Sequence, residues 1–317
     1  MDPLSHLIQQ ARPQALLELR CTLGGAAQLP HAAAPAGVLP FHLVLAGQCR
    51  VRVPGQPETL LQAGDWLLLP QGSAHDLAPG QPRSSLQSPQ PLQWDVDGWL
   101  PLRHDGRAAQ GDPALDLLCG HFQFAAGPMQ LLLRGLPPVW TVPLAPLLPT
   151  LPLMGDWLRR ETQDGLPGAR ALVTALCQAL LTLALRHSSA PAGAAPPPGT
   201  LALLGHARLR PAVQAMLGDP AQPWTLAELA QRCALSRASL ARHFLQVAGQ
   251  PPLAWLTAWR LALAHQALQD SPHSVADIAH SVGYSSPAAL ARPFAAAFGC
   301  SPASCRRSGQ ASDKAKP

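Results

Sequence analysis

A pattern in the C-terminal third repeats after 50 residues, and it constrains the fold more than any other feature of the chain. The motif Arg-x-Phe-x4-Gly-x2-Pro occurs at Arg242–Pro252 and again at Arg292–Pro302. Leu240 matches Leu290 at the same spacing, whereas Ala230 matches Ala279 at one residue less. A repeat of this size indicates a duplicated supersecondary unit, so we expect two helical units built alike.

The first copy predicts two short helices joined by a turn. Thr225 and Glu228 have the spacing of a capping box, which starts a helix. Ser236 can cap a second helix, in which Leu240 and Phe244 are four residues apart and face the core. The cap and the outward-facing side of this helix give the candidate contact residues Ser236, Arg237, Ala238, Ser239, Arg242 and His243.

The second copy predicts the same arrangement. Ser274 is the expected cap of its first helix, and Gly283 stands in the turn, where a positive φ is useful. Ser285 or Ser286 would cap the second helix, with Pro287 at its first position. Leu290 and Phe294 would face inward. The outward-facing candidates are Ser285, Ser286, Ala288 and Arg292.

Pro293 lies inside the second helix of this copy. Proline lacks a backbone donor and clashes with the preceding turn, so we expect it to kink or shorten the helix. The first unit would then carry most of the base reading, and Arg292 would only hold phosphate.

The charge of the chain is uneven. Residues 201–317 contain 11 Lys and Arg against 5 Asp and Glu, whereas residues 1–200 contain 12 against 13. A helix over about residues 252–268, with Trp255, Trp259 and Leu263 on one side, would join the two units. A basic region with two outward-facing Arg- and Ser-bearing helices is typical of proteins that read the major groove of double-stranded DNA.

The N-terminal region differs in kind. Short runs such as Phe41–Leu45 and Trp66–Leu69, bounded by Gly and Pro, indicate a β-sandwich or barrel up to about residue 145. Residues 150–187 predict two amphipathic helices, the second with its inner face formed by Leu172, Leu176, Leu180, Leu183 and Ala184. These helices either form a dimer seam or cover the sheet. We therefore expect a sensor and dimerisation domain at 1–187, a Pro/Ala-rich linker at 188–200, the DNA-binding domain at 201–308 and a disordered tail at 309–317.

The seven cysteines are odd in number and form no Cys-x-x-Cys pair, which argues against a disulfide framework and a zinc knuckle. Buried, inert thiols are the expectation for Cys49 and Cys119, with redox or metal sensing as the alternative. The N-terminus lacks the pattern of a signal peptide, and the apolar stretch Leu172–Leu185 is too short to span a bilayer. We expect a cytoplasmic protein without a membrane partner.

About residues 205–307 closely resemble the AraC/XylS-type regulators, through the stretches Trp224–Ala230, Ser236–Phe244, Trp259–Leu261, Val275–Ala279, Val282–Tyr284 and Phe298–Pro302. The resemblance implies a two-headed reader of promoter DNA that also touches RNA polymerase, and the family leans toward activation. Ala295 and Ala296 stand where basic residues are common in the family, and Cys305 where tyrosine is common.

Residues 1 to about 185 resemble cupin-type sensor domains, through Phe41–Gly47, Gly64–Pro70 and Gly72–His75. The resemblance implies a barrel that binds a small-molecule effector, with His42, His75 and His121 as candidate contacts. Catalytic cupins hold a metal through His-x-His, a glutamate and a later histidine. Val44 replaces the second histidine here and the next glutamate is Glu58, so we expect no metal, no cofactor and no catalytic residue.

The predicted fold is therefore α+β and multidomain: a cupin-like β-barrel with a helical hairpin, then an all-α domain with two helix-turn-helix units. The predicted function is ligand-responsive transcriptional regulation, with a homodimer as one arrangement. Two alternatives stay open at this point. One is a cupin metalloenzyme with an accessory DNA module, and the other is a structural DNA binder without sequence preference.

Overall fold

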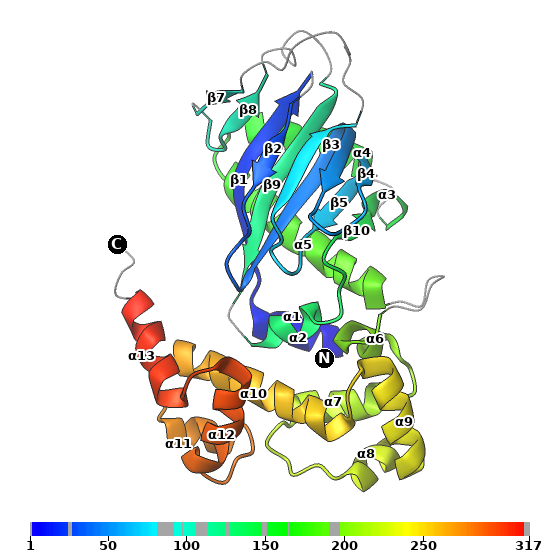
Figure 1. Ribbon diagram of the computed structural model, residues 1–317, viewed down its shortest axis with the longest axis vertical. Coiled ribbons are helices and arrows are strands. Elements are labelled where there is room, and N and C mark those ends of the chain that lie inside the picture. Colours follow the sequence, from blue (N-terminus) through cyan, green and yellow to red (C-terminus); the bar gives the residue numbers. More distant parts are fainter. Residues whose placement is uncertain are drawn as a thin grey trace. The chain divides into compact units, whose positions relative to one another are not determined.

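The computed structural model describes residues 2–24, 27–80, 92–96, 98–105, 113–124, 127–147, 151–163, 165–189 and 197–313. It divides into two compact units (Figure 1). The β unit comprises Pro13–Phe124 and Leu136–His187. The helical unit comprises Met1–Arg12, Ala125–Gly135 and Ser188–Pro317.

The β unit is built on one curled sheet, which agrees with the barrel rather than the sandwich among the two architectures that the sequence predicted. Its strands are β1 (Gln14–Leu23), β2 (Leu29–His31), β3 (Val38–Arg52), β4 (Thr59–Gln62), β5 (Asp65–Leu68), β6 (His75–Pro79), β7 (Gln93–Asp95), β8 (Leu102–His104), β9 (Leu115–Gln123) and β10 (Trp140–Pro143). The main path runs β10-β5-β3-β9-β1-β8-β7, with β4 and β6 paired to β3 and β2 paired to β6. Apart from β1 with β8, the pairs are antiparallel.

The long strand β3 gives the sheet its curl. Its first part pairs with β5, and its second part pairs with β4 and β6, while β9 lies along most of its length. The register shifts between Val44 and Ala46, and Gly47 follows with φ +77°. A Cβ at Gly47 would lie 1.9 Å from the carbonyl oxygen of Ala114, so this crossing requires glycine. The result is a cupin-like half-barrel around an apolar core.

The predicted helical hairpin is present as α4 (Leu151–Gln163) and α5 (Ala169–Ser189), after the short α3 (Leu144–Leu147). The buried side of α5 is formed by Val173, Cys177, Leu180, Leu181, Ala184 and Leu185. Leu172, expected on the inner face, is 48% exposed, so that face is rotated from the predicted one. Among the described helices, α5 is the one long and apolar enough for a membrane span, and such a helix is weak evidence because core helices pass the same criterion.

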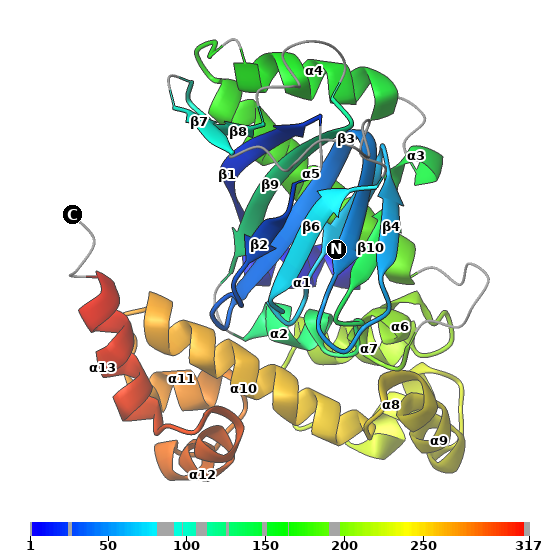
Figure 2. The ribbon, with the colours of Figure 1, turned by 45° about the horizontal axis from the view of Figure 1, so that its top comes forward.

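The helical unit contains both predicted helix pairs. Its C-terminal helices are α6 (Thr200–Gly205), α7 (Arg210–Gly218), α8 (Leu226–Arg232), α9 (Arg237–Ala248), α10 (Pro252–Asp270), α11 (Val275–Ser281), α12 (Pro287–Phe298) and α13 (Pro302–Asp313). The α8–α9 pair lies at one end of α10 and the α11–α12 pair at the other (Figure 2). Trp255 and Trp259 of α10 are fully buried, as their helical spacing indicated.

Two segments that precede the predicted boundary at residue 187, the N-terminal helix and a segment after β9, belong to the helical unit and not to the β unit. Helix α1 (Pro3–Ala11) packs on α7 and on α2 (Pro128–Leu133), and α2 also packs on α10 and α6. Leu7 is fully buried, and Gln266 Nε2 donates a hydrogen bond to the carbonyl oxygen of Gln10 over 2.7 Å. Because α1 directly precedes β1 and α2 follows β9, the sequence does not indicate that these short helices belong to a different unit from the two strands.

The C-terminus also differs from expectation. Helix α13 continues to Asp313, so residues 309–313, expected to be disordered, are helical. Pro302 and Cys305 are buried near its start and α13 packs on α10, which favours its continuation. Residues 314–317 of the predicted tail and 190–196 of the predicted linker lie outside the described residues.

Candidate functional site

Both helix pairs start at the predicted caps. Thr225 and Glu228 form a complete capping box at α8, and Ser236 Oγ accepts a hydrogen bond from the Ser239 amide at α9. Ser274 caps α11, where Asp277 completes a second capping box that sequence reasoning missed, although the Ser-x-x-Asp spacing was visible. Of the two candidates at α12, Ser286 is the cap, and its Oγ accepts from the Ala289 amide.

The turns of the two pairs match in conformation. Gly283 has φ +87°, and Ala234, at the corresponding place in the first pair, has φ +50°. A Cβ at Gly283 would approach the Ala221 carbonyl oxygen to 2.8 Å, which explains why glycine stands there. The second turn is one residue longer, since four residues separate α8 from α9 and five separate α11 from α12.

Helix α9 exposes one polar side. Leu240 and Phe244 are fully buried, whereas Arg237, Ala238 and Arg242 are exposed together with the cap Ser236. Ser239 and His243 are half-buried, and Ser239 Oγ lies 3.4 Å from His243 Nδ1. The arrangement offers hydrogen-bond donors and positive charge along the first two turns of a capped helix.

Helix α12 has the same length as α9, 12 residues, and it continues through Pro293. The expectation that Pro293 shortens this helix is therefore wrong. Packing explains the outcome, since Leu290 and Phe294 on either side of the proline are fully buried. Ser285, Ala288 and Arg292 are exposed, and Ser286 is half-buried.

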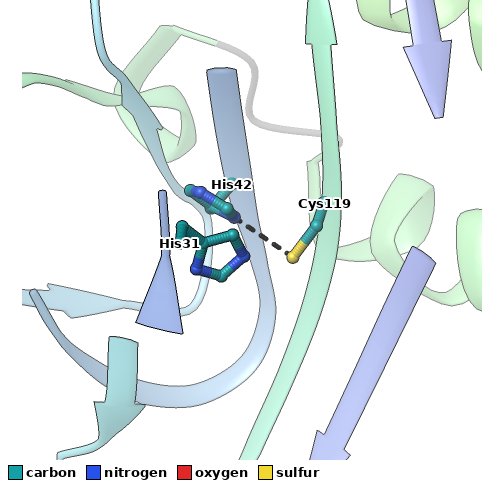
Figure 3. A group of neighbouring side chains, drawn as sticks. All are labelled: His31, His42 and Cys119. Carbon is teal, nitrogen blue, oxygen red and sulfur yellow. Dashed lines mark hydrogen bonds between the residues drawn. The ribbon is translucent and has the colours of Figure 1, made fainter. Parts of the chain in front are cut away.

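A second candidate site lies inside the β unit, where three histidines and a cysteine meet. His42 of β3 places Nε2 2.8 Å from Nε2 of His75 on β6, and Nδ1 3.1 Å from Sγ of Cys119 on β9. The ring of His31 on β2 is stacked on His75, with centroids 4.6 Å apart, and lies 4.8 Å from the His42 centroid. Figure 3 shows His31, His42 and Cys119 gathered from three strands.

Burial keeps these groups uncharged. It lowers the pKa of His42 well below its usual value, lowers that of His75 to about 4, and also lowers the pKa of His31. The neighbouring Cys21 thiol and burial together raise the pKa of Cys119 well above its usual value. At neutral pH the cluster is therefore a set of neutral imidazoles beside a protonated thiol.

Of the candidate contacts predicted from sequence, the structure brings His42 and His75 together and leaves His121 out. His121 lies two residues beyond Cys119, but its Nδ1 pairs with Glu18 Oε1 at 2.7 Å and its side chain is 23% exposed. Sequence reasoning missed His31 as a member, because the short strand β2 carries no pattern that marks it. It considered Cys119 only as a separate thiol.

Known proteins match both regions. Residues 2–190 match the family model described as Cupin, and residues 229–308 match the model described as Helix-turn-helix domain. The "RCS-specific HTH-type transcriptional activator RclR" of Escherichia coli is 33% identical over 96% of this chain and 97% of its own. An AraC-like transcription regulator of Streptomyces lividans is 32% identical over 97% of this chain and 98% of its own.

The chain belongs to the AraC family of transcriptional regulators. This AraC-family protein is a DNA-binding transcriptional regulator. Its helical unit is also similar to the DNA-binding domain of AdpA, solved with a target DNA, at 31% identity and a TM-score of 0.33, over 34% of this chain and 98% of that chain.

Proposed function

We propose that this regulator binds promoter DNA sequence-specifically through α9 and α12, and that a small ligand in the β unit controls the binding. The observation that supports the DNA-reading part is the duplication of geometry. Two capped helices of equal length expose Ser, Ala and Arg on one side and are joined by the single helix α10. Recognition helices of this class contact base edges with their N-terminal residues.

The two helices would contribute unequally. On α9, Arg237 and Ser239 stand in the first turn, where an arginine can pair with guanine and a serine with several bases. Arg242 and His243, a turn later, would contact phosphate. Ser285 before the cap and Ala288 and Arg292 on α12 are exposed and offer fewer donors, so this helix would add mainly phosphate contacts.

A footprint on the DNA upstream of the gene and its neighbours tests this proposal. Because α12 is not shortened, we expect protection over two adjacent major grooves on one face, about 34 Å apart. Protection of a single groove would contradict the two-headed reading. Loss of protection upon competition with unrelated DNA would favour a binder without sequence preference.

Arg237→Ala gives the matching test on one residue. Loss of a base contact should weaken specific binding by about 1–3 kcal/mol and relax selectivity at one base pair. The control is Arg52→Ala, which removes an exposed arginine from β3 of the β unit. Equal effects of the two substitutions, or unchanged selectivity in Arg237→Ala, would remove Arg237 from the reading face.

The effect of the ligand on DNA binding would be transmitted through the two chain connections between the β unit and the helical unit. Strand β9, which bears Cys119, ends at Gln123, and α2 begins at Pro128 within the helical unit. Strand β1, paired with β9, begins three residues after α1 ends at Ala11. A ligand that favours one arrangement of these strands would thereby favour one arrangement of the helices packed on α10 and α7.

Activation of transcription in the cytoplasm through contact with RNA polymerase is part of the proposal, supported by the word activator in the name of the Escherichia coli relative. In vitro transcription from a footprinted promoter would test it. A homodimer through the helical hairpin is proposed as well, since Trp157 of α4 and Leu172 of α5 are exposed. Sedimentation of Leu172→Glu against the unchanged protein would test that arrangement.

A further inference from the structure

The β unit directs three ligand atoms toward one point. One ring nitrogen each of His31 and His42 and the sulfur of Cys119 all lie within 4.8 Å of one another (Figure 3). We propose that these three residues bind one thiophilic metal ion, Cu(I), and that its binding is the signal to which the regulator responds. The signalling role rests on the proposed function, whereas the metal site itself does not.

The hydrogen bonds of the rings orient their lone pairs for this purpose. His31 Nδ1 lies 3.0 Å from the Leu29 carbonyl oxygen, which can only accept, so this nitrogen carries the proton and Nε2 carries the lone pair. His75 Nδ1 likewise donates to the Ser73 carbonyl oxygen over 2.9 Å. Its Nε2 therefore accepts from His42 Nε2, and His42 Nδ1 presents its lone pair to Cys119.

This pattern is the one that metal-binding histidines use. A ligating imidazole usually donates its other ring N–H to a carbonyl or another acceptor, which fixes its tautomer and orientation. Here Leu29 would orient His31, and His75, itself held by Ser73, would orient His42. His75 would thus be a positioning residue, and His31, His42 and Cys119 would be the ligands.

The spacing fits a metal with little movement. With metal–nitrogen bonds of about 2.0–2.1 Å and a metal–sulfur bond of about 2.3 Å, three ligand atoms around one ion lie roughly 3.5–4 Å apart. His42 Nδ1 and Cys119 Sγ are 3.1 Å apart, and the widest pair of ligand atoms is within 4.8 Å. Side-chain rotations that move the atoms by about 1 Å would complete the geometry.

The total charge of the three ligands and the softness of the thiolate determine which metal ion the site prefers. Two neutral imidazoles and one thiolate carry a charge of −1, so a monovalent ion gives a neutral site and a divalent ion leaves +1 among buried groups, which is costly. Glu18 and Asp76, the carboxylates that act electrostatically on His31, are both exposed. Thiolate ligands select Cu(I) and zinc, and the charge favours Cu(I) of these two.

The donor set differs from that of catalytic cupins and from our sequence expectation. The missing His-x-His pair led us to expect no metal, because His42 and His75 alone are a poor site. His31, on the strand just before β3, and Cys119, on the distant strand β9, supply what is missing. Binding requires only that the Cys119 thiol release its proton to solvent as the sulfur–copper bond forms, and copper stays in the +1 state.

Metal titration of the full-length protein tests the site. Chelator-treated protein is titrated anaerobically with Cu(I) against a chromophoric Cu(I) chelator, and separately with Zn(II). We expect one Cu(I) per chain, absent in Cys119→Ser and His42→Ala, and bound about 10–100-fold more weakly in His75→Ala. The matched controls are Cys49→Ser, another buried thiol of the same core, and His121→Gln, both of which should bind as the unchanged protein does.

X-ray absorption at the copper edge of the unchanged protein gives a second measurement that needs no variant to fold. One sulfur and two nitrogen neighbours would support the site, and a copper bound by two or more sulfurs would overturn it. Undiminished stoichiometric binding in a folded Cys119→Ser, or no binding by the unchanged protein, would overturn it as well. Tighter binding of Zn(II) than of Cu(I) would overturn the choice of ion.

The footprint, combined with the metal titration, distinguishes the metal site itself from its proposed role in signalling. Promoter protection without any metal binding would reject the metal site and leave the proposed DNA reading intact. Metal binding without promoter protection would reject the DNA reading and leave the site intact. A footprint that is unchanged by Cu(I) in the unchanged protein would reject the signalling role alone.

Discussion

At the scale of residues, Arg20 and Asp116 form an ion pair inside the β unit, with side chains 5% and 1% exposed. The guanidinium donates from Nε and Nη2 to the two carboxylate oxygens over 2.9 and 2.8 Å. Its Nη1 donates to the Arg159 carbonyl oxygen and to Thr162 of α4. The pair therefore links β1, β9 and α4, and every polar atom of the guanidinium has a partner.

Asp116→Asn should lower the free energy of unfolding of the β unit by about 3–5 kcal/mol, because it leaves the Arg20 charge buried without its counterion. Denaturant unfolding monitored by circular dichroism measures the change. Glu58→Gln, which removes the partner of Arg52 from an exposed ion pair, is the control and should have little effect. Equal stability of the two variants would show that Arg20 finds another partner or water.

The cysteines give a second prediction at this scale. Six of the seven are buried, and burial raises the pKa of Cys49 and of Cys177 to about 12. Only Cys300 is half-exposed. A thiol-specific alkylating reagent at neutral pH should therefore modify Cys300 first in the folded protein, as peptide mass spectrometry would reveal. Early modification of Cys49 or Cys119 would instead support a reactive sensor thiol.

At the scale of elements, Pro293 removes one backbone hydrogen bond from the interior of α12 without ending it. Pro293→Ala restores the donor at a half-buried position, so the helical unit should gain about 1–3 kcal/mol in free energy of unfolding. Protection of the second major groove should stay or improve. Thermal unfolding and the footprint measure the two effects, and a large loss of DNA binding would mean that the proline sets the shape of the reading face.

How well an element could be predicted depended on whether its signal is local. The caps at Thr225, Ser236 and Ser274 and the turn at Gly283 are each determined within a few neighbouring residues, and the structure confirms all of them. The inner side of α5 was predicted less well. That helix carries apolar residues almost all round, so periodicity cannot select one face, and packing against the rest of the β unit decides.

The histidine cluster illustrates the opposite case. His42 and His75 were predicted because each belongs to a recognisable local motif. His31 and Cys119 join them only through strand pairing, β2 with β6 and β3 with β9, whose register no short stretch of sequence encodes. His121 was misplaced for the same reason, since Glu18 of the neighbouring strand β1 draws it into a surface pair.

At the scale of the whole molecule, the chain does not divide at one point into a sensor and a reader. In the sequence, residues 1–12 come just before β1 and residues 125–135 come just after β9, yet both segments belong to the helical unit. The helical unit therefore includes two segments that end more than 50 residues before its main segment begins at Ser188. A fragment limited to residues 201–308 would lack α1 and α2 and would expose the surfaces that they cover.

A substitution at Leu7 tests how much α1 contributes to the stability of the helical unit. Its side chain is fully buried within the helical unit, so Leu7→Ala should lower the free energy of unfolding of that unit by about 2–5 kcal/mol. Gln9→Ala, on the exposed side of the same helix, is the matched control and should change little. Tryptophan fluorescence during denaturant unfolding is a suitable probe, because Trp255 and Trp259 are buried in α10 and His6 of α1 contacts the Trp259 ring.

DNA binding by the same variants completes the comparison. If α1 stabilises the unit that carries the reading helices, Leu7→Ala should weaken promoter binding. This loss would be indirect, because the proposed DNA contacts are on α9 and α12 and not on α1. The unchanged affinity of Gln9→Ala would show that the effect comes from packing. Leu7→Ala with unchanged stability and unchanged affinity would mean that α1 is dispensable, and the chain connection from β1 to the helical unit could not then carry the signal.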